Sequence, residues 1–119
     1  MIYCISDIHG EYDKFIQMLG LIGLRDEDTL YVLGDVFDRE CDISEYALYE
    51  LVWARPDYDT PYFDDIITVM GHTPTPIILG CDTPGKIFKK NNFVVIDCGA
   101  AMGGQLGCLR LDDMVEFYV

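Results

Sequence analysis

Three short polar motifs in this sequence carry residue types that bind divalent metal ions and phosphate. Asp7 and His9 stand two residues apart, so in an extended chain their side chains share a face. Asp35 and His72 each follow a glycine farther along the chain. Carboxylate and imidazole groups suit Zn, Mn or Fe, and two ions about 3.5–4 Å apart can activate a water and clamp phosphoryl oxygens. The residue types therefore indicate a metal centre that acts on phosphate.

Two further residues of the second motif are candidates for catalysis. Arg39 carries a planar guanidinium, which grips phosphate oxygens in pairs. Asp38 beside it is placed to orient a neighbouring group by hydrogen bonding. We interpret both as catalytic residues.

Each motif also has an ordinary structural interpretation when it is taken alone. An Asp-x-His sequence is often a turn with a solvated carboxylate, and an aspartate after a glycine is a common turn residue. Asp38 and Arg39 could form a surface ion pair that contributes little to folding stability. A lone histidine such as His72 is more often structural than a ligand. What favours a site is that all three motifs directly follow predicted strands.

The predicted strands explain how motifs so far apart could meet. Residues 2–6 are apolar and β-prone, residues 11–22 carry apolar side chains at helical spacing, and residues 29–33 form a second apolar run. Residues 66–70 form a third such run, ahead of His72. Because ligands bind at the carboxyl ends of parallel strands in α/β sheets, we expect the three motifs to meet at one sheet edge.

The rest of the chain is predicted to hold one more helix and an antiparallel β region. An acidic capping pattern precedes residues 44–54, and Pro56 would end a helix there. Residues 91–92 and 112–113 are turn-forming pairs flanked by apolar, β-prone runs, which indicates two hairpins. These patterns predict a mixed α/β fold with a single domain over residues 1–119.

Composition narrows the class of protein. The chain has 119 residues, 50% of them hydrophobic, and a net charge of −13, which would repel nucleic acid and anionic lipid. We therefore expect neither nucleic acid nor a membrane as a partner.

The five cysteines form no CxxC pair, which argues against a disulfide framework and indicates small buried residues in a reducing compartment. With no signal-peptide pattern and no apolar run of membrane-spanning length, we expect a cytoplasmic protein.

Taken together, the motifs resemble the calcineurin-like metallophosphoesterases, most closely the bacterial phosphoprotein (Ser/Thr) phosphatases and the symmetrical diadenosine tetraphosphatases. The resemblance follows the family's motif order over nearly the whole chain. The segments that carry it are Asp7-Ile8-His9-Gly10, Gly34-Asp35-Val36-Phe37-Asp38-Arg39, Leu51-Val52-Trp53-Ala54-Arg55-Pro56-Asp57-Tyr58, Val69-Met70-Gly71-His72-Thr73-Pro74, Ile96-Asp97-Cys98-Gly99-Ala100 and Gly103-Gly104-Gln105-Leu106. The resemblance implies a two-metal hydrolase built as a layered αββα sandwich.

The resemblance also implies a metal-binding role for four residues. Asp7 and His9 would bind the first metal ion. Asp35 would bridge the two ions, and His72 would bind the second. The expected cofactor is a divalent ion, Mn first, with Fe or Zn as alternatives.

For the substrate, the resemblance implies a phosphorylated partner, either a phosphoprotein or a nucleotide. Arg39 and Arg55 would contact its phosphate. The expected reaction is hydrolysis of a phosphomonoester or a dinucleoside polyphosphate by a metal-activated hydroxide.

Two central motifs of the family are missing from this chain. They supply an asparagine ligand, a further histidine ligand and a histidine general acid, and only residues 40–52 stand where they belong. The chain contains 2 histidines, both already taken as metal ligands. We therefore predict a sandwich abridged by an internal deletion near residues 40–44, with an incomplete second metal site. Loss of general acid catalysis alone should lower the reaction rate by a factor of about 10²–10⁴.

Three functions stay open on these observations. The first is an active metallophosphoesterase. The second is a catalytically impaired remnant that binds metal or phosphate in a regulatory or interaction role. The third is an internally deleted gene product without function. Because a deletion would expose apolar faces, we also expect homo-oligomers or marginal folding.

Overall fold

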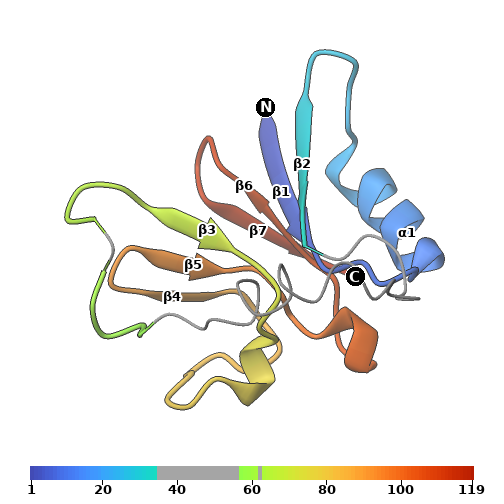
Figure 1. Ribbon diagram of the computed structural model, residues 1–119. Coiled ribbons are helices and arrows are strands. Elements are labelled where there is room, and N and C mark those ends of the chain that lie inside the picture. Colours follow the sequence, from blue (N-terminus) through green and yellow to red (C-terminus); the bar gives the residue numbers. More distant parts are fainter. Residues whose placement is uncertain (35–56, 62) are drawn as a thin grey trace, which may run out of the picture.

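The computed structural model of this protein describes residues 1–34, 57–61 and 63–119 (Figure 1). Over these residues the fold is mixed α/β, with one α-helix and two β-sheets of strand order β2-β1-β6-β7 and β3-β5-β4. The predicted fold class is therefore confirmed. The predicted helix over residues 44–54 and the expected deletion near residues 40–44 lie outside the described residues.

The four-stranded sheet is built around the first strand, β1 (Ile2–Ser6). On one side β1 pairs in parallel with β2 (Thr29–Leu33), and on the other it pairs antiparallel with β6 (Gly107–Arg110). β7 (Val115–Tyr118) closes the sheet as the antiparallel partner of β6. The parallel β1–β2 pair and the β6–β7 hairpin both match the sequence predictions.

Helix α1 (Tyr12–Ile22) connects β1 to β2 and covers one face of the four-stranded sheet (Figure 1). Met18 lies fully buried on its inner side. The helix runs through Gly20 and ends at Gly23, whose φ of 59° is left-handed and whose N–H donates to the Leu19 carbonyl at 3.2 Å. A glycine adopts this conformation without a Cβ clash, which explains where the helix stops.

The three-stranded sheet holds the third motif. β3 (Thr68–Met70) pairs in parallel with β5 (Phe93–Val95), which pairs antiparallel with β4 (Phe88–Lys90). Residues 91–92 form the turn between β4 and β5, as predicted. The strand expected over residues 66–70 is shorter than predicted, because its first two isoleucines are exposed and unpaired with a strand.

The two sheets share a core because β1 is buried on both of its faces. Tyr3 and Ile5 face the cluster that contains Met18 of α1, whereas Cys4 faces the cluster that contains Val94 of the three-stranded sheet. Side chains alternate across a strand, so one five-residue strand contributes to both layers. The order of layers is therefore helix, four-stranded sheet, three-stranded sheet.

Two short 3-10 helices lie beyond the ends of the strands. They are η2 (Thr75–Ile77) and η3 (Ala100–Met102). The Thr75 N–H donates to the Asp97 carbonyl at 2.9 Å, so the segment after β3 is tied to the segment after β5. Across residues 1–34, 57–61 and 63–119, no helix has both the length and the apolar character needed to cross a membrane.

The cysteines that the structure describes are free thiols, and three of the four are buried as expected. Cys4, Cys98 and Cys108 are buried, and Cys81 is partly exposed. Burial raises the pKa of Cys98 to about 12, with a further contribution from the nearby Asp97 carboxylate. Burial likewise raises the pKa of Cys108 to about 12. Since the thiolate is the reactive form, these two buried thiols are inert near neutral pH.

Native-state alkylation tests this ordering of the thiols. Against an ordinary value of 9.0, a pKa of about 12 lowers the thiolate fraction roughly a thousandfold at neutral pH, before restricted access is counted. We expect iodoacetamide to modify Cys81 well before Cys98 or Cys108, as read by peptide mass spectrometry. Equal rates for Cys81 and Cys98 in a protein that keeps its circular dichroism spectrum would contradict the described burial.

The packing of α1 is testable by truncating its buried side chain. Met18→Ala should lower the free energy of unfolding by about 2–5 kcal/mol, because it leaves a cavity in the layer between the helix and the sheet. Ile16→Ala is the matched control, since Ile16 lies on the same helix and is 46% exposed. Urea denaturation followed by circular dichroism should show less than half the loss for the control. Equal losses would mean that α1 does not pack as described.

Candidate metal centre

Asp7 lies at the point where the two sheets meet. It directly follows β1 and is only 1% exposed. Its backbone N–H donates to the Leu33 carbonyl at the end of β2, at 3.0 Å. Its Oδ2 accepts a hydrogen bond of 2.7 Å from the backbone N–H of His72, which follows β3. Asp7 therefore ties together the ends of three strands, β2 through its backbone and the segment after β3 through its carboxylate.

The convergence that the sequence predicted is present for the first and third motifs, with one difference, whereas the second motif beyond Gly34 lies outside the described residues. The prediction placed all three motifs at one edge of one sheet, whereas β3 belongs to the second sheet. The first and third motifs meet across the ends of two layered sheets, through the hydrogen bond between Asp7 and His72. Strand pairing alone could not reveal this, because it depends on how one sheet packs on the other.

His9 lies on the open side of the Asp7 carboxylate. Its Nε2 is 3.8 Å from Asp7 Oδ1, and its side chain is 25% exposed. The two carboxylate oxygens therefore have different surroundings: Oδ2 accepts from the His72 backbone, and Oδ1 faces an imidazole nitrogen. This arrangement places a buried carboxylate oxygen next to a partly exposed imidazole nitrogen.

Two glycines form a cradle around the Asp7 carboxylate. A Cβ added to Gly34 would lie 2.6 Å from Asp7 Oδ1, and one added to Gly71 would lie 2.6 Å from the Ser6 Oγ. Real Cβ atoms essentially never approach so closely, so any side chain at either position would displace the carboxylate or its neighbour. Gly34 also has a φ of 79°, which disfavours other residues. Both motifs thus contain glycine because the carboxylate needs the space.

The backbone at this site is strained. Asp7, His9 and His72 have φ values of 49°, 47° and 71°, in the left-handed region that costs non-glycine residues roughly 1–3 kcal/mol each. The other non-glycine residues with positive φ that the structure describes are two asparagines of the β4–β5 turn and Met114 of the β6–β7 turn. Such strain clusters at functional sites. It independently marks the three residues that the motifs single out.

Two polar residues near these elements were not among the site residues predicted from the sequence. Ser6 is 2% exposed, and its Oγ has no hydrogen-bond partner among the residues described. Asp97 is 4% exposed, and its Oδ1 accepts from the Gly99 N–H at 3.0 Å, which holds the turn into η3. A polar residue at the end of an apolar strand is the signal that marks both of them in the sequence.

The described residues bring together some of the predicted metal ligands. Asp7 and His9 form an oxygen and nitrogen pair, and no group of three or more His, Cys, Asp or Glu able to hold an ion occurs within residues 1–34, 57–61 and 63–119. Asp35, the expected bridging ligand, lies outside these residues, as do Asp38, Arg39 and Arg55. The donor types and the glycine cradle fit a divalent ion such as Mn, Fe or Zn. The full ligand set stays a prediction.

The family model for calcineurin-like phosphoesterases matches residues 1–72 of this chain. The match covers more than half of the 119 residues and contains β1, α1, β2, β3 and the Asp7 site. No curated protein and no solved structure matches the chain. The chain belongs to the calcineurin-like phosphoesterase family, which confirms the resemblance at the level of the family.

The glycine cradle gives a direct test of the site. Gly71→Ala should lower Mn²⁺ affinity at least tenfold, because the new methyl group pushes against Ser6 and the Asp7 carboxylate. Gly20→Ala is the control, since a Cβ there meets nothing within 4 Å and alanine favours the helix. Isothermal titration calorimetry measures the affinity, and circular dichroism checks folding. Unchanged affinity in folded Gly71→Ala protein would show that the cradle does not position a ligand.

Proposed function

We propose that this protein is a metal-dependent phosphoesterase of the phosphoprotein phosphatase type, acting in the cytoplasm on a phosphomonoester. The observation that carries the proposal is the buried Asp7 carboxylate, held by the His72 N–H at the junction of two sheets in a calcineurin-like phosphoesterase chain. A phosphomonoester is favoured over a dinucleoside polyphosphate because a chain of net charge −13 repels a polyanion more strongly.

The proposed reaction adds water to phosphorus and releases an alcohol. The water oxygen bonds to phosphorus, the bond between phosphorus and the leaving oxygen breaks, and the proton of water ends on the leaving oxygen. A divalent ion, Mn first and Fe or Zn as alternatives, supplies Lewis-acid stabilisation of the phosphoryl oxygens and lowers the pKa of water when bound.

The chain's own residues hold the ligands in place. The His72 N–H fixes Asp7 Oδ2, so Oδ1 points to the side where His9 Nε2 lies 3.8 Å away. Fixing a ligating carboxylate through its second oxygen is a common way to orient a metal ligand. The proposal keeps Asp35 as the bridging ligand and Arg39 as the phosphate contact.

One observation favours a second candidate function. The chain has 2 histidines, and the proposal uses both at the metal centre, so no histidine is left to protonate a leaving oxygen. A catalytically impaired protein that binds metal and phosphate in a regulatory role, as a homo-oligomer or with another partner, is the alternative.

Hydrolysis of 4-nitrophenyl phosphate with and without Mn²⁺ tests the proposal. We expect turnover that EDTA abolishes and Mn²⁺ restores. Asp7→Asn should lower this turnover by at least about 100-fold, because the neutral amide binds the ion poorly. Asp26→Asn, a change of the same type in an exposed loop, should leave turnover unchanged.

Two outcomes would decide against the enzyme. Turnover that persists in EDTA would contradict metal dependence. Stoichiometric Mn²⁺ binding with no turnover would support the non-catalytic alternative.

A further inference from the structure

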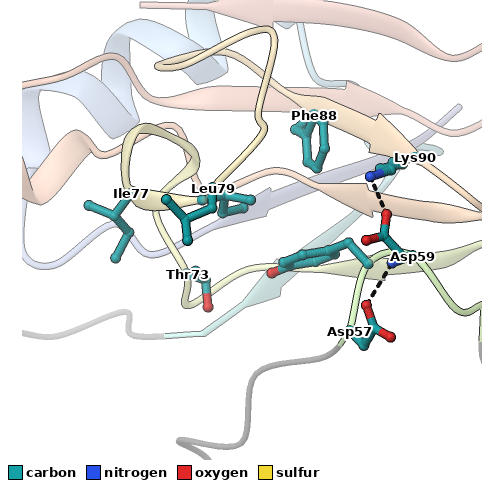
Figure 2. Close-up of a pocket in the computed structure, with 9 residues that line it drawn as sticks. Asp57, Asp59, Thr73, Ile77, Leu79, Phe88 and Lys90 are labelled. Carbon is teal, nitrogen blue, oxygen red and sulfur yellow. Dashed lines mark hydrogen bonds and ion pairs between the residues drawn. The ribbon is translucent and has the colours of Figure 1, made fainter.

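A pocket of about 310 Å³ reaches the segment that follows β3 (Figure 2). Thr73, the residue after His72, is among its lining residues. The pocket is bounded by the turn that starts at Asp57, by η2 and the two residues that follow it, and by β4. A group bound there would lie next to the segment whose backbone N–H holds the Asp7 carboxylate.

One wall of the pocket is firmly held in place. The Tyr58 ring packs edge-on against Phe88 and Phe93, with centroid distances of 6.1 and 5.6 Å. The Asn91 side-chain amide donates to the carbonyls of Tyr58 and Asp59, at 2.9 and 3.3 Å. These contacts fix the 57–59 turn to the β4–β5 hairpin. The wall is therefore formed before any ligand arrives, which lowers the entropic cost of binding.

The opposite side of the pocket is apolar and open to solvent. Figure 2 shows Ile77 and Leu79 on one side and Asp57, Asp59 and Lys90 on the other. Leu79 is 100% exposed and Ile77 is 47% exposed, although both are large hydrophobic residues. Covering such side chains is favourable, in proportion to the apolar area removed from water. The lining thus favours an apolar group.

The polar rim is unsuited to a phosphate. Lys90 Nζ is paired with Asp59, so its charge is already compensated. Asp57 accepts hydrogen bonds from the Asp59 N–H at 2.9 Å and from the Thr60 hydroxyl at 3.1 Å, and it adds a negative charge. A phosphoryl group would therefore be repelled from this rim. The pocket suits the uncharged part of a substrate whose phosphate lies at the metal centre.

The volume of the pocket is large enough to hold an aromatic ring. An apolar cavity of about 150 Å³ accepts benzene, and this pocket of about 310 Å³ has room for one aromatic ring with its substituents. Phe88 and Tyr58 are among its lining residues and offer aromatic contacts.

The missing general acid points to the same class of substrate. An aliphatic leaving oxygen, with a pKa near that of water at about 15.7, needs protonation as its bond to phosphorus breaks. A phenolic oxygen has a pKa of about 10 and leaves as the phenolate, which takes up its proton from solvent afterwards. A chain whose 2 histidines are both assigned to the proposed metal centre is therefore best suited to phenolic leaving groups.

We propose that this pocket receives the aromatic ring of an aryl phosphate, the class that includes phosphotyrosine, while the phosphate lies at the Asp7 centre. The proposal rests on the proposed phosphoesterase function. Leu79 and Ile77 would be specificity-determining residues that contact the ring.

A variant of the exposed wall tests the proposal by kinetics. Leu79→Ser should lower the ratio of kcat/KM for phenyl phosphate over glycerol 2-phosphate about tenfold, because only the aryl substrate loses an apolar contact. Leu21→Ser, a half-exposed leucine on α1, is the matched control and should leave the ratio unchanged. An equal loss for both substrates, or no loss for either, would overturn the proposal.

Three further substrates identify the source of the ring. A phosphotyrosine peptide and free phosphotyrosine should both be hydrolysed faster than a phosphoserine peptide. Preference for the peptide over the free amino acid would identify a protein substrate, and the reverse would identify a small aryl phosphate. Faster hydrolysis of the phosphoserine peptide would overturn the proposal.

A binding measurement separates failure of the pocket from failure of the enzyme. Titration with 4-nitrophenol should shift the methyl resonances of Leu79 and Ile77 but not those of Leu21, and Leu79→Ser should weaken this binding. Binding of this kind in a protein without turnover would support the pocket and reject the phosphoesterase function. Turnover of aryl phosphates without any methyl shift would reject the pocket alone.

Discussion

The Asp7 carboxylate is the constraint on which the rest of this site depends. It is buried at the end of β1, and its Oδ2 accepts the His72 N–H at 2.7 Å. A buried carboxylate is costly unless hydrogen bonds or cations compensate it, so the surrounding chain must supply them. The strained backbone at Asp7, His9 and His72 and the side-chain-free positions at Gly34 and Gly71 are what that arrangement requires.

The core and the site are coupled through the same strand. β1 places Tyr3 and Ile5 against the helix layer and Cys4 against the second sheet, and it ends at the residue before Asp7. Packing on both faces leaves β1 little freedom to shift, because protein interiors are close-packed. The position of the carboxylate is therefore set by hydrophobic packing several residues away. This explains how the chain can hold backbone strain around the Asp7 carboxylate.

The segment after β3 serves two purposes in the proposed mechanism. His72 holds the carboxylate through its backbone, and the next residues form one side of the neighbouring pocket. The acidic rim and the apolar wall of that pocket are suited to the leaving group, whereas the metal centre is suited to the phosphate. In the proposal, the segment after β3 therefore contributes to recognition of both halves of a substrate. Membership of the calcineurin-like phosphoesterase family accounts for the first part and leaves the second to this chain's own residues.

The sequence by itself determined the elements and the candidate ligands. Local patterns sufficed for the β-α-β start, for the turns at residues 91–92 and 112–113, and for Asp7, His9 and His72 as residues of interest, because hydrophobic period and turn chemistry are local properties. Only the tertiary structure decided that β3 lies in a second sheet, that two glycines enclose the carboxylate, and that a pocket opens beside Thr73. These features depend on how the layers pack, and packing joins residues far apart in the chain through contacts that no local pattern encodes.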